Sequence, residues 1–80
     1  SLSSTESYVL SIARVRDYSP SDKEILQHLG IKRPRLSQIS NKLLKSGILD
    51  ARMKGRSRYY KITQSAKAQL IAWGIIGGDE

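Results

Sequence analysis

Residues 29–49 read LGIKRPRLSQISNKLLKSGIL, a stretch that predicts the end of one helix, a short turn and a complete second helix. Gly30 is placed to end the first helix in the left-handed conformation, and Pro34 suits the first turn of the second. Gly47 is a stop signal for that second helix. Between Pro34 and Gly47, apolar side chains recur at the three- and four-residue spacing of a buried helix face: Leu36, Ile39, Leu43 and Leu44.

Two helices are predicted before this point. In the first, Ser3 and Glu6 have the spacing of a capping box. An apolar stripe of Tyr8, Ile12 and Val15, with Val9 and Ala13 beside it, follows at helical spacing, and Tyr18-Ser19-Pro20 is expected to end the helix. In the second helix, Ser19 is the expected cap, Pro20 takes the first helical position and Asp22 complements the helix dipole. The expected apolar face of this helix consists of Ile25, Leu26 and Leu29.

After Gly47 the apolar period changes from that of a helix to that of strands. An extended segment runs from Ile48 to Met53, and Gly55-Arg56-Ser57 is a turn signal. The chain then returns through Arg58 to Ile62, with Tyr60 and Ile62 on one face and Tyr59 and Lys61 on the other. This pattern predicts a β-hairpin with a basic tip, followed by a last helix that Thr63 caps. The predicted core combines residues of all these elements: Ile12, Ile25, Leu26, Leu29, Leu36, Ile39, Leu43, Ile48, Tyr60 and Ile62.

The positive charge of the chain is concentrated in one segment. The 80 residues carry a net charge of +7. Residues 32–61 contain ten Lys and Arg against the single acid Asp50, a net charge of +9, so that the rest of the chain carries −2. Such asymmetry is the electrostatic footprint of a protein that binds a polyanion, although a solvated basic surface is an alternative explanation of charge alone.

The outward face of the helix after Pro34 carries the chemistry needed to recognise base pairs. Two helices joined by about three residues form a helix-turn-helix unit, whose second helix enters the major groove of DNA. Arginine can bind guanine through two hydrogen bonds, and Asn or Gln can bind adenine in the same way. The candidate DNA-binding residues of this helix are Arg33, Arg35, Ser37, Gln38, Asn41 and Lys42, with Lys45 on the same side.

The sequence resembles winged helix-turn-helix regulators, especially MarR-, ArsR- and PadR-like proteins and small archaeal or viral relatives. The resemblance covers about residues 20–70 and rests on the order and spacing of several short motifs: Leu29-Gly30-Ile31, Arg33-Pro34, Leu36-Ser37, Leu43 to Leu49, Gly55 to Tyr60 and Ile62-Thr63. It implies a mainly α fold with a small β-hairpin, in which a three-helix core carries a basic wing and a C-terminal helix. It also implies DNA contacts, which would come from Arg33, Arg35, Ser37, Gln38 and Asn41 of the helix and from Arg56 and Arg58 of the wing. Lys54 and Ser57, beside these two arginines, are the further candidates of the wing.

The resemblance sets expected boundaries within one domain of residues 1–80. The helix-turn-helix is expected at about 20–46, the wing at about 48–62 and the C-terminal helix at about 63–73. The sequence departs from the family pattern at Lys32, where a small capping residue is usual, and at Ala66, where many relatives have glycine. The long terminal helices that dimerise MarR proteins are missing or very short. Ser37 and Asn41 also differ from the Asn and Tyr of Z-DNA-binding winged helices.

Other function classes find little support in the sequence. There is no cysteine and only one histidine, His28, so neither a zinc site nor another metal site is expected. No catalytic residues, cofactor, signal peptide or membrane-spanning run are expected either, and a cytoplasmic, nucleoid-associated protein is the default expectation. The leading prediction is a sequence-specific double-stranded DNA-binding regulator, a repressor. The alternatives are a winged-helix interaction module of a replication or transcription assembly, and an RNA-binding protein.

The C-terminal segment is relevant to assembly. Trp73, Ile75 and Ile76 are apolar residues near the end of the chain. They either fold back over the first helix or pair two protomers. We expect a homodimer through this segment, because a palindromic site doubles the number of base pairs that a small domain contacts.

Overall fold

The computed structural model describes residues 2–74, which form four helices and one β-hairpin. The helices are α1 (Ser4–Ala13), α2 (Lys23–Leu29), α3 (Arg33–Lys45) and α4 (Gln64–Ala72). Strands β1 (Leu49–Lys54) and β2 (Ser57–Ile62) pair antiparallel between α3 and α4. The prediction of a mainly α fold with a small β-hairpin is confirmed.

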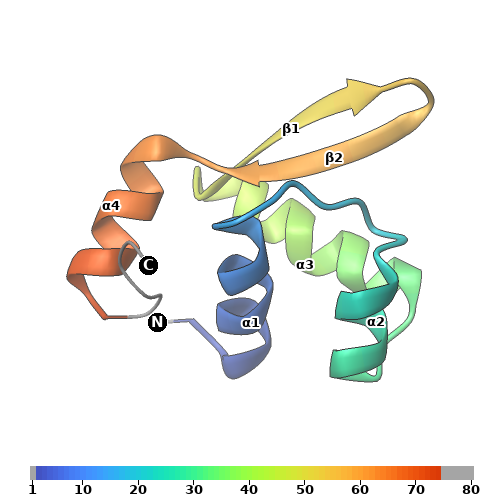
Figure 1. The fold of residues 1–80 in the computed structure, drawn as a ribbon, viewed down its shortest axis with the longest axis horizontal. Coiled ribbons are helices and arrows are strands. Elements are labelled where there is room, and N and C mark those ends of the chain that lie inside the picture. Colours follow the sequence, from blue (N-terminus) through green and yellow to red (C-terminus); the bar gives the residue numbers. More distant parts are fainter. Residues whose placement is uncertain (1, 75–80) are drawn as a thin grey trace.

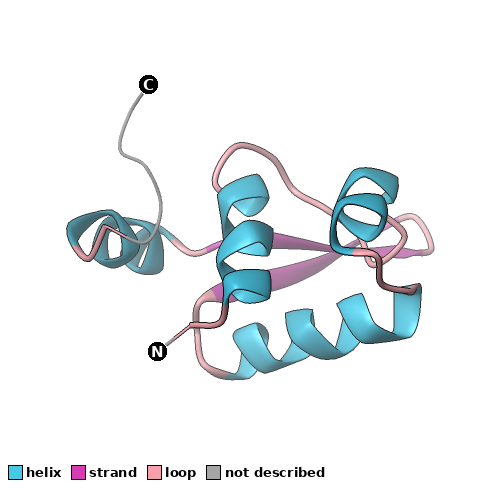
Figure 2. Ribbon diagram, turned by 90° about the horizontal axis from the view of Figure 1, so that it is seen from below, coloured by secondary structure: helices cyan, strands magenta, loops and turns pink. Residues whose placement is uncertain are grey.

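The hairpin and the first three helices form one packed unit. α1 stands between α2 and α4, and α3 runs across the ends of α1 and α2 (Figures 1 and 2). The hairpin extends from its root beside α4 to a tip on the side of α2 (Figure 1). The second helix of the helix-turn-helix and the wing therefore lie next to each other. Among the described residues, no helix has both the length and the apolar character needed to cross a membrane.

α1 begins as expected but ends earlier than expected. The capping box of Ser3 and Glu6 is present, with both reciprocal hydrogen bonds. The helix ends at Ala13, so the expected stripe through Val15 is wrong, and Val15 is 66% exposed. The chain has to leave the helix before that point because Tyr18 pairs with Tyr60 of β2 as an isolated β-bridge. The buried face of α1 consists instead of Glu6, Val9, Leu10 and Ala13.

The cap of α2 also differs from the prediction. Asp22, not Ser19, is the N-cap, and its Oδ1 accepts a hydrogen bond from the backbone N–H of Ile25 at 3.1 Å. Pro20 consequently lies in the loop before the helix, not at its first position. Ser19 serves that loop, where its Oγ accepts from the backbone N–H of Ser21 at 3.3 Å. At the other end, Gly30 adopts the left-handed conformation that was expected, with φ of 65°.

α3 follows the predicted pattern more closely. Its first turn contains Pro34, and Lys32 provides no side-chain cap, as the departure from the family pattern suggested. The inward face buries Leu36, Ile39 and Leu43, while the predicted Leu44 is half-buried. Ser40 is also fully buried on this face, which the apolar pattern did not indicate.

The hairpin turn is tighter than expected. Lys54 pairs with Ser57, so the turn consists of Gly55 and Arg56 alone, and Ser57 already belongs to β2. Gly55 has φ of 62°, and no residue other than glycine has a positive φ in residues 2–74. A glycine at the first position of a two-residue turn is typical of type II′, which matches the twist of the paired strands. The turn therefore presents Arg56 at the tip of the wing.

The core contains half of the residues predicted for it and several others. Ile25, Leu36, Ile39, Leu43 and Tyr60 are buried as expected, whereas the other five predicted residues lie half-buried at its margin: Ile12, Leu26, Leu29, Ile48 and Ile62. The predicted list omitted the other residues of the buried cluster: Val9, Leu10, Ala13, Tyr18, Leu49 and Leu70. The cap of α4 by Thr63 is confirmed, since its Oγ1 accepts from the backbone N–H of Ala66 at 3.3 Å.

Candidate nucleic-acid interface

The outer face of α3 presents most of the sequence-predicted residues to solvent. Arg33, Arg35, Gln38 and Lys42 are exposed, while Ser37 and Asn41 are half-buried. Gln38, Asn41 and Lys42 border one hollow together with Lys45, and Arg35 borders another with Gln38 and Lys42. Arg33 and Ser37 line a separate hollow between α3 and the wing. The six candidates of this helix therefore lie on two sides of its outer surface.

Two of the candidate amide groups are already engaged through their oxygen atoms. Nη1 of Arg35 donates to Oε1 of Gln38 at 2.7 Å. The hydroxyl of Tyr60 donates to Oδ1 of Asn41 at 2.8 Å. An amide whose oxygen is occupied retains its two N–H donors for an external partner. As it stands in this structure, the face therefore presents donors from its arginines, lysines and amides.

Lys42 is one of the exposed candidates of α3, and it also forms an ion pair with α1. Its Nζ lies 3.1 Å from Oε2 of Glu6, although the Lys42 side chain is 75% exposed. The carboxyl of Glu6 is itself largely buried and accepts from the backbone N–H of Ser3 at 2.9 Å. That backbone hydrogen bond is the main reason why the pKa of Glu6 is lowered; burial opposes it, and Lys42 adds to the lowering. Lys42 thus links α3 to the start of α1.

The wing carries its candidate residues at the tip of the hairpin, where all four are exposed: Lys54, Arg56, Ser57 and Arg58. Aromatic rings lie beneath two of the cations. Nζ of Lys54 is 5.7 Å from the centre of the Tyr59 ring, and the guanidinium carbon of Arg58 is 5.6 Å from that of Tyr60. Because side chains alternate along a strand, Arg58 and Tyr60 face the helices and Lys54 and Tyr59 face away.

A pair of tyrosines joins the wing to α3. Tyr18 and Tyr60 exchange backbone hydrogen bonds of 3.1 and 2.8 Å, and their ring centres are 5.5 Å apart. The hydroxyl of Tyr18 lies 2.5 Å from Oγ of the buried Ser40, and that of Tyr60 reaches Asn41. Burial raises the pKa of Tyr18, which therefore stays protonated. Both tyrosines thus hold the root of the wing at a fixed position relative to two adjacent residues of α3.

The tyrosine pair is the functional feature that sequence reasoning missed. Tyr60 was expected in the core, but its hydrogen bond to Asn41 was not predicted. The sequence contains only the alternation of β2, which places Tyr60 inward, and the polar Ser40 within an apolar helix face. A buried hydroxyl needs a hydrogen-bond partner, so Ser40 was a signal that some polar side chain would reach it.

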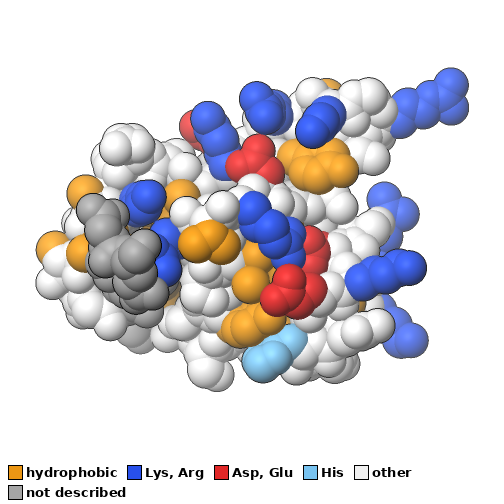
Figure 3. Space-filling model, viewed as in Figure 1, with side chains coloured by type: hydrophobic (Ala, Val, Ile, Leu, Met, Phe, Trp, Pro, Cys, Tyr) orange, Lys and Arg blue, Asp and Glu red, His pale blue; other side chains and the backbone are white. Residues whose placement is uncertain are grey.

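Charge is distributed unevenly over the surface. Figure 3 shows Lys and Arg side chains along the hairpin and at the edge near α2, whereas most of the Asp and Glu side chains on this side lie between the hairpin and α2. Three of the acids are paired with arginines: Asp22 and Glu24 both bind Arg16, at 2.6 and 2.9 Å, and Asp17 lies 3.5 Å from Arg52. In the part of the chain that the structure describes, no group of three or more His, Cys, Asp and Glu residues could hold a metal ion.

Solved structures with similar folds were found. The adhesin competence repressor AdcR of Streptococcus pyogenes superposes with a TM-score of 0.74 and 19% identity, over 92% of this chain and 55% of that one. Rv0081 of Mycobacterium tuberculosis superposes with a TM-score of 0.75 and 27% identity, over 90% of this chain and 71% of that one. No protein-family model and no curated protein matches the sequence.

A third similar structure is described as a homodimeric winged helix-turn-helix DNA-binding domain from Mycobacterium bovis, a possible ArsR-family transcriptional regulator. It superposes with a TM-score of 0.72 and 21% identity, over 90% of this chain and 65% of that one. The present chain spans about half the length of AdcR and of ZitR from Lactococcus lactis, 55% and 51% respectively. With its three-helix core, its hairpin wing and its C-terminal helix, the chain has the winged helix-turn-helix fold of these transcriptional regulators.

Proposed function

We propose that this protein binds double-stranded DNA as a transcriptional regulator, with α3 in the major groove and the wing against the sugar–phosphate backbone. The observation that carries the proposal is the cationic surface formed by two adjacent elements. α3 presents Arg33 and Arg35, and the wing presents Arg56 and Arg58, with Asp50 as the single acid between residues 32 and 61. A major groove admits one α-helix, and phosphates flank it on both sides.

The alternatives fit this surface less well. A protein-interaction module would be expected to present an apolar or mixed-charge face, whereas the outer face of α3 is cationic and rich in amides. The major groove of A-form RNA is too deep and narrow for a helix to read. AdcR is described as a repressor, and we assign the same sign of regulation to this protein. A bacterial-type regulator of this kind acts on nucleoid DNA in the cytoplasm.

The donor-rich character of α3 favours guanine as the base that it reads. The oxygen atoms of Gln38 and Asn41 accept from Arg35 and Tyr60, so the amides offer N–H donors. Guanine presents two acceptors, N7 and O6, in the major groove, whereas adenine presents one acceptor and one donor. A face composed of donors matches guanine edges better than adenine edges. Because Tyr60 occupies its oxygen, Asn41 is less suited to bind adenine through both amide atoms.

The binding test compares nucleic acids of different form at one salt concentration. Fluorescence anisotropy with a duplex DNA pool, its single strands and a duplex RNA of the same sequence should give the highest affinity for duplex DNA. Arg56→Ala should weaken that affinity about tenfold and reduce the slope of log affinity against log salt by about one contact. The matched control is Lys67→Gln, which also removes one positive charge but lies on α4, away from the wing. It should leave the affinity and the salt slope nearly unchanged. Equal binding to all three nucleic acids would contradict the proposal.

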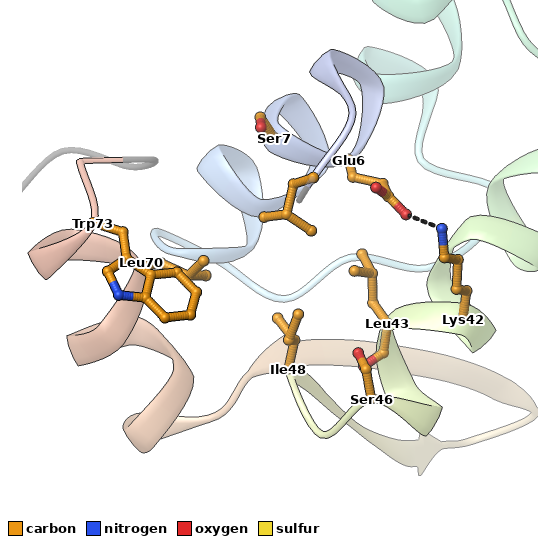
Figure 4. A pocket seen from close by; sticks show the side chains of 9 residues that line it. Glu6, Ser7, Lys42, Leu43, Ser46, Ile48, Leu70 and Trp73 are labelled. Atoms are coloured by element: carbon orange, nitrogen blue, oxygen red, sulfur yellow. Dashed lines mark hydrogen bonds and ion pairs between the residues drawn. The ribbon is translucent and has the colours of Figure 1, made fainter.

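We further infer that two copies of the chain pair through the surface around α4. Trp73, at the end of α4, is 64% exposed. It borders a groove of about 620 Å³, whose lining includes Leu2, Leu43, Ile48 and Leu70 (Figure 4). An exposed tryptophan beside an apolar groove is typical of a contact surface, since tryptophan is enriched among residues that dominate binding. Ile75 and Ile76, which the sequence analysis placed in the same contact, lie outside the described residues.

The assembly test is sedimentation velocity over a range of protein concentrations. A homodimer is expected for the wild type, in keeping with the homodimeric domain from Mycobacterium bovis, and Trp73→Ala should shift it towards the monomer. Val15→Ala removes a side chain of similar exposure from the end of α1 and serves as the control. A wild type that remains monomeric at the highest concentration would exclude this pairing.

A further inference from the structure

We propose that the hollow between α3, the wing and the loop before α2 is a binding cleft for a phosphodiester group of the DNA backbone. The proposal rests on the proposed function and assigns one particular phosphate contact to it. The hollow has a volume of about 230 Å³, and the loop contributes Ser19 and Ser21, which the sequence analysis did not associate with DNA. α3 contributes Arg33 and Ser37 to its lining, and the wing contributes Arg56, Ser57 and Arg58.

Among the described residues, the cations of this cleft have no carboxylate partner, and no acidic side chain lines the hollow. Within residues 2–74, no ion pair or hydrogen bond is formed by the guanidinium groups of Arg33 and Arg56, and that of Arg58 lies over the ring of Tyr60. Three uncompensated guanidinium groups around one small hollow repel one another, so an anion between them would relieve the repulsion. Guanidinium is also the side-chain group whose fork of donors best matches phosphate oxygens.

The serines supply the remaining donors. Oγ of Ser19 accepts from the backbone N–H of Ser21, so the Ser19 hydroxyl keeps its own proton to donate. Ser21 and Ser37 line the same hollow from the loop and from α3. Ser57 borders it from β2, although the alternation of the strand directs its side chain away from the helices. A phosphate accepts several hydrogen bonds through its two unbridged oxygens, and hydroxyl donors next to guanidinium groups complete such a site.

The loop that carries Ser19 and Ser21 is held in place from both sides. On one side, Tyr18 exchanges two backbone hydrogen bonds with Tyr60 of the wing. On the other, Arg16 binds both Asp22, the cap of α2, and Glu24. The serines are therefore ordered before any ligand arrives, which reduces the entropy lost on binding.

The position of the cleft favours a backbone phosphodiester over a free phosphate or nucleotide. The cleft lies between the helix assigned to the major groove and the wing, where the strand that borders the groove has to pass. Its volume is below the range of about 300–1,000 Å³ that is usual for small-molecule sites. A single phosphate group fills such a space, with the chain continuing out of it in both directions.

The experiment measures whether the loop serines and Arg56 act on the same phosphate. The double substitution Ser19→Ala with Ser21→Ala should weaken binding to a random duplex DNA about tenfold without changing the salt slope, since it removes no charge. Arg56→Ala should weaken it by a similar factor and lower the slope by about one. The variant that combines all three substitutions should lose less affinity than the product of the two separate fold-losses, because the free-energy effects of groups that share one partner are not additive. Ser65→Ala on α4 is the matched control, and thermal melting checks that each variant is folded.

Each outcome is decisive. Two results would overturn the assignment of the cleft and leave the proposed function intact. One is a combined loss of affinity equal to the product of the two separate losses, and the other is wild-type affinity in the serine double variant. Failure of the wild type to bind duplex DNA would overturn the proposed function itself. Inorganic phosphate should displace the duplex no better than chloride at equal ionic strength. Stronger displacement by phosphate that disappears in Arg56→Ala would identify a receptor for free phosphate and would contradict the phosphodiester assignment.

Discussion

Arginine side chains have different partners in two regions of the molecule. On the side of α1 and α2, Arg16 is enclosed by carboxylates, with hydrogen bonds of 2.6 Å to Asp22 and 2.9 Å to Glu24. On the side of α3 and the wing, Arg33 and Arg56 form no ion pair or hydrogen bond through their guanidinium groups within the described residues. Arginine therefore stabilises the fold in the first region, whereas in the second its guanidinium groups are available to bind an external anion.

The unpaired cations of the wing and α3 have an electrostatic cost in the free protein, and binding of DNA would remove it. The hydrogen bonds to Asp22 and Glu24 raise the pKa of Arg16, which shows that its charge is stabilised by the protein itself. Like charges crowded on the wing and α3 instead repel one another in the free protein. DNA phosphates remove that repulsion and release counterions. Substitutions in the two regions should consequently affect different measurements, stability on one side and DNA affinity on the other.

The largest effect is expected from charge reversal on the wing. Arg56→Glu removes one phosphate contact and adds repulsion from the neighbouring phosphates, so the affinity for duplex DNA should fall on the order of 100-fold at low salt. The melting temperature should stay the same or rise slightly, because crowding of positive charge is relieved. Anisotropy and thermal denaturation measure the two effects separately. A variant that lost stability in proportion to affinity would remove the distinction between the two regions.

A smaller effect, of the opposite kind, is expected in the paired region. Asp22→Ala removes the cap of α2 and one partner of Arg16, so the free energy of unfolding should fall by about 1–2 kcal/mol. The DNA affinity of the folded protein should fall by clearly less than the tenfold expected of the loop serines, because Glu24 still binds Arg16 and no DNA-facing charge is changed. Asp50→Ala, on the exposed face of β1, is the control and should change stability by less than about 0.5 kcal/mol. Chemical denaturation measures these free energies.

The tyrosine pair connects the two regions and provides a third test. Tyr60→Phe deletes the hydroxyl that donates to Asn41, which should reduce the free energy of unfolding by about 1 kcal/mol. It also frees Oδ1 of Asn41 to accept a hydrogen bond, so selection from a random duplex pool should show a weaker preference for guanine over adenine at one position. Tyr59→Phe, on the other face of the hairpin, should leave the selected sequence unchanged. An unaltered selection in Tyr60→Phe would show that Asn41 does not read a base.

The smallest effect is expected from mild acid. Hydrogen bonding lowers the pKa of Asp22, mainly through Arg16, and the pKa of Glu6, mainly through the Ser3 backbone. Because both folded values lie below the ordinary values of 3.8 and 4.5, these groups stabilise the protein fully above about pH 5. That contribution is lost as the pH falls through the folded pKa values. Asp22→Asn combined with Glu6→Gln should flatten the stability profile between about pH 5 and pH 3, and an unchanged profile would contradict this assignment.

Patterns that depend only on near neighbours in the chain were predictable. Four features follow from spacings of four residues or fewer between successive positions: the capping box of Ser3 and Glu6, the left-handed Gly30, the inward face of α3 and the cap at Thr63. The basic segment of residues 32–61 could likewise be read directly, and with it the expectation of a polyanionic partner. Hydrogen-bond spacing and helical period are local properties, so the sequence by itself is sufficient for them.

Features that join distant segments were decided only by the tertiary structure. Tyr18 forms a β-bridge with Tyr60, α1 ends before the exposed Val15, and Asp22 rather than Ser19 caps α2. Tyr60 also occupies the oxygen of Asn41, and the loop places Ser19 and Ser21 beside arginines that lie far away in sequence. Local propensities leave several helix ends and several partners for an amide nearly equal in energy. The choice among them depends on which groups the packed core brings within hydrogen-bond distance.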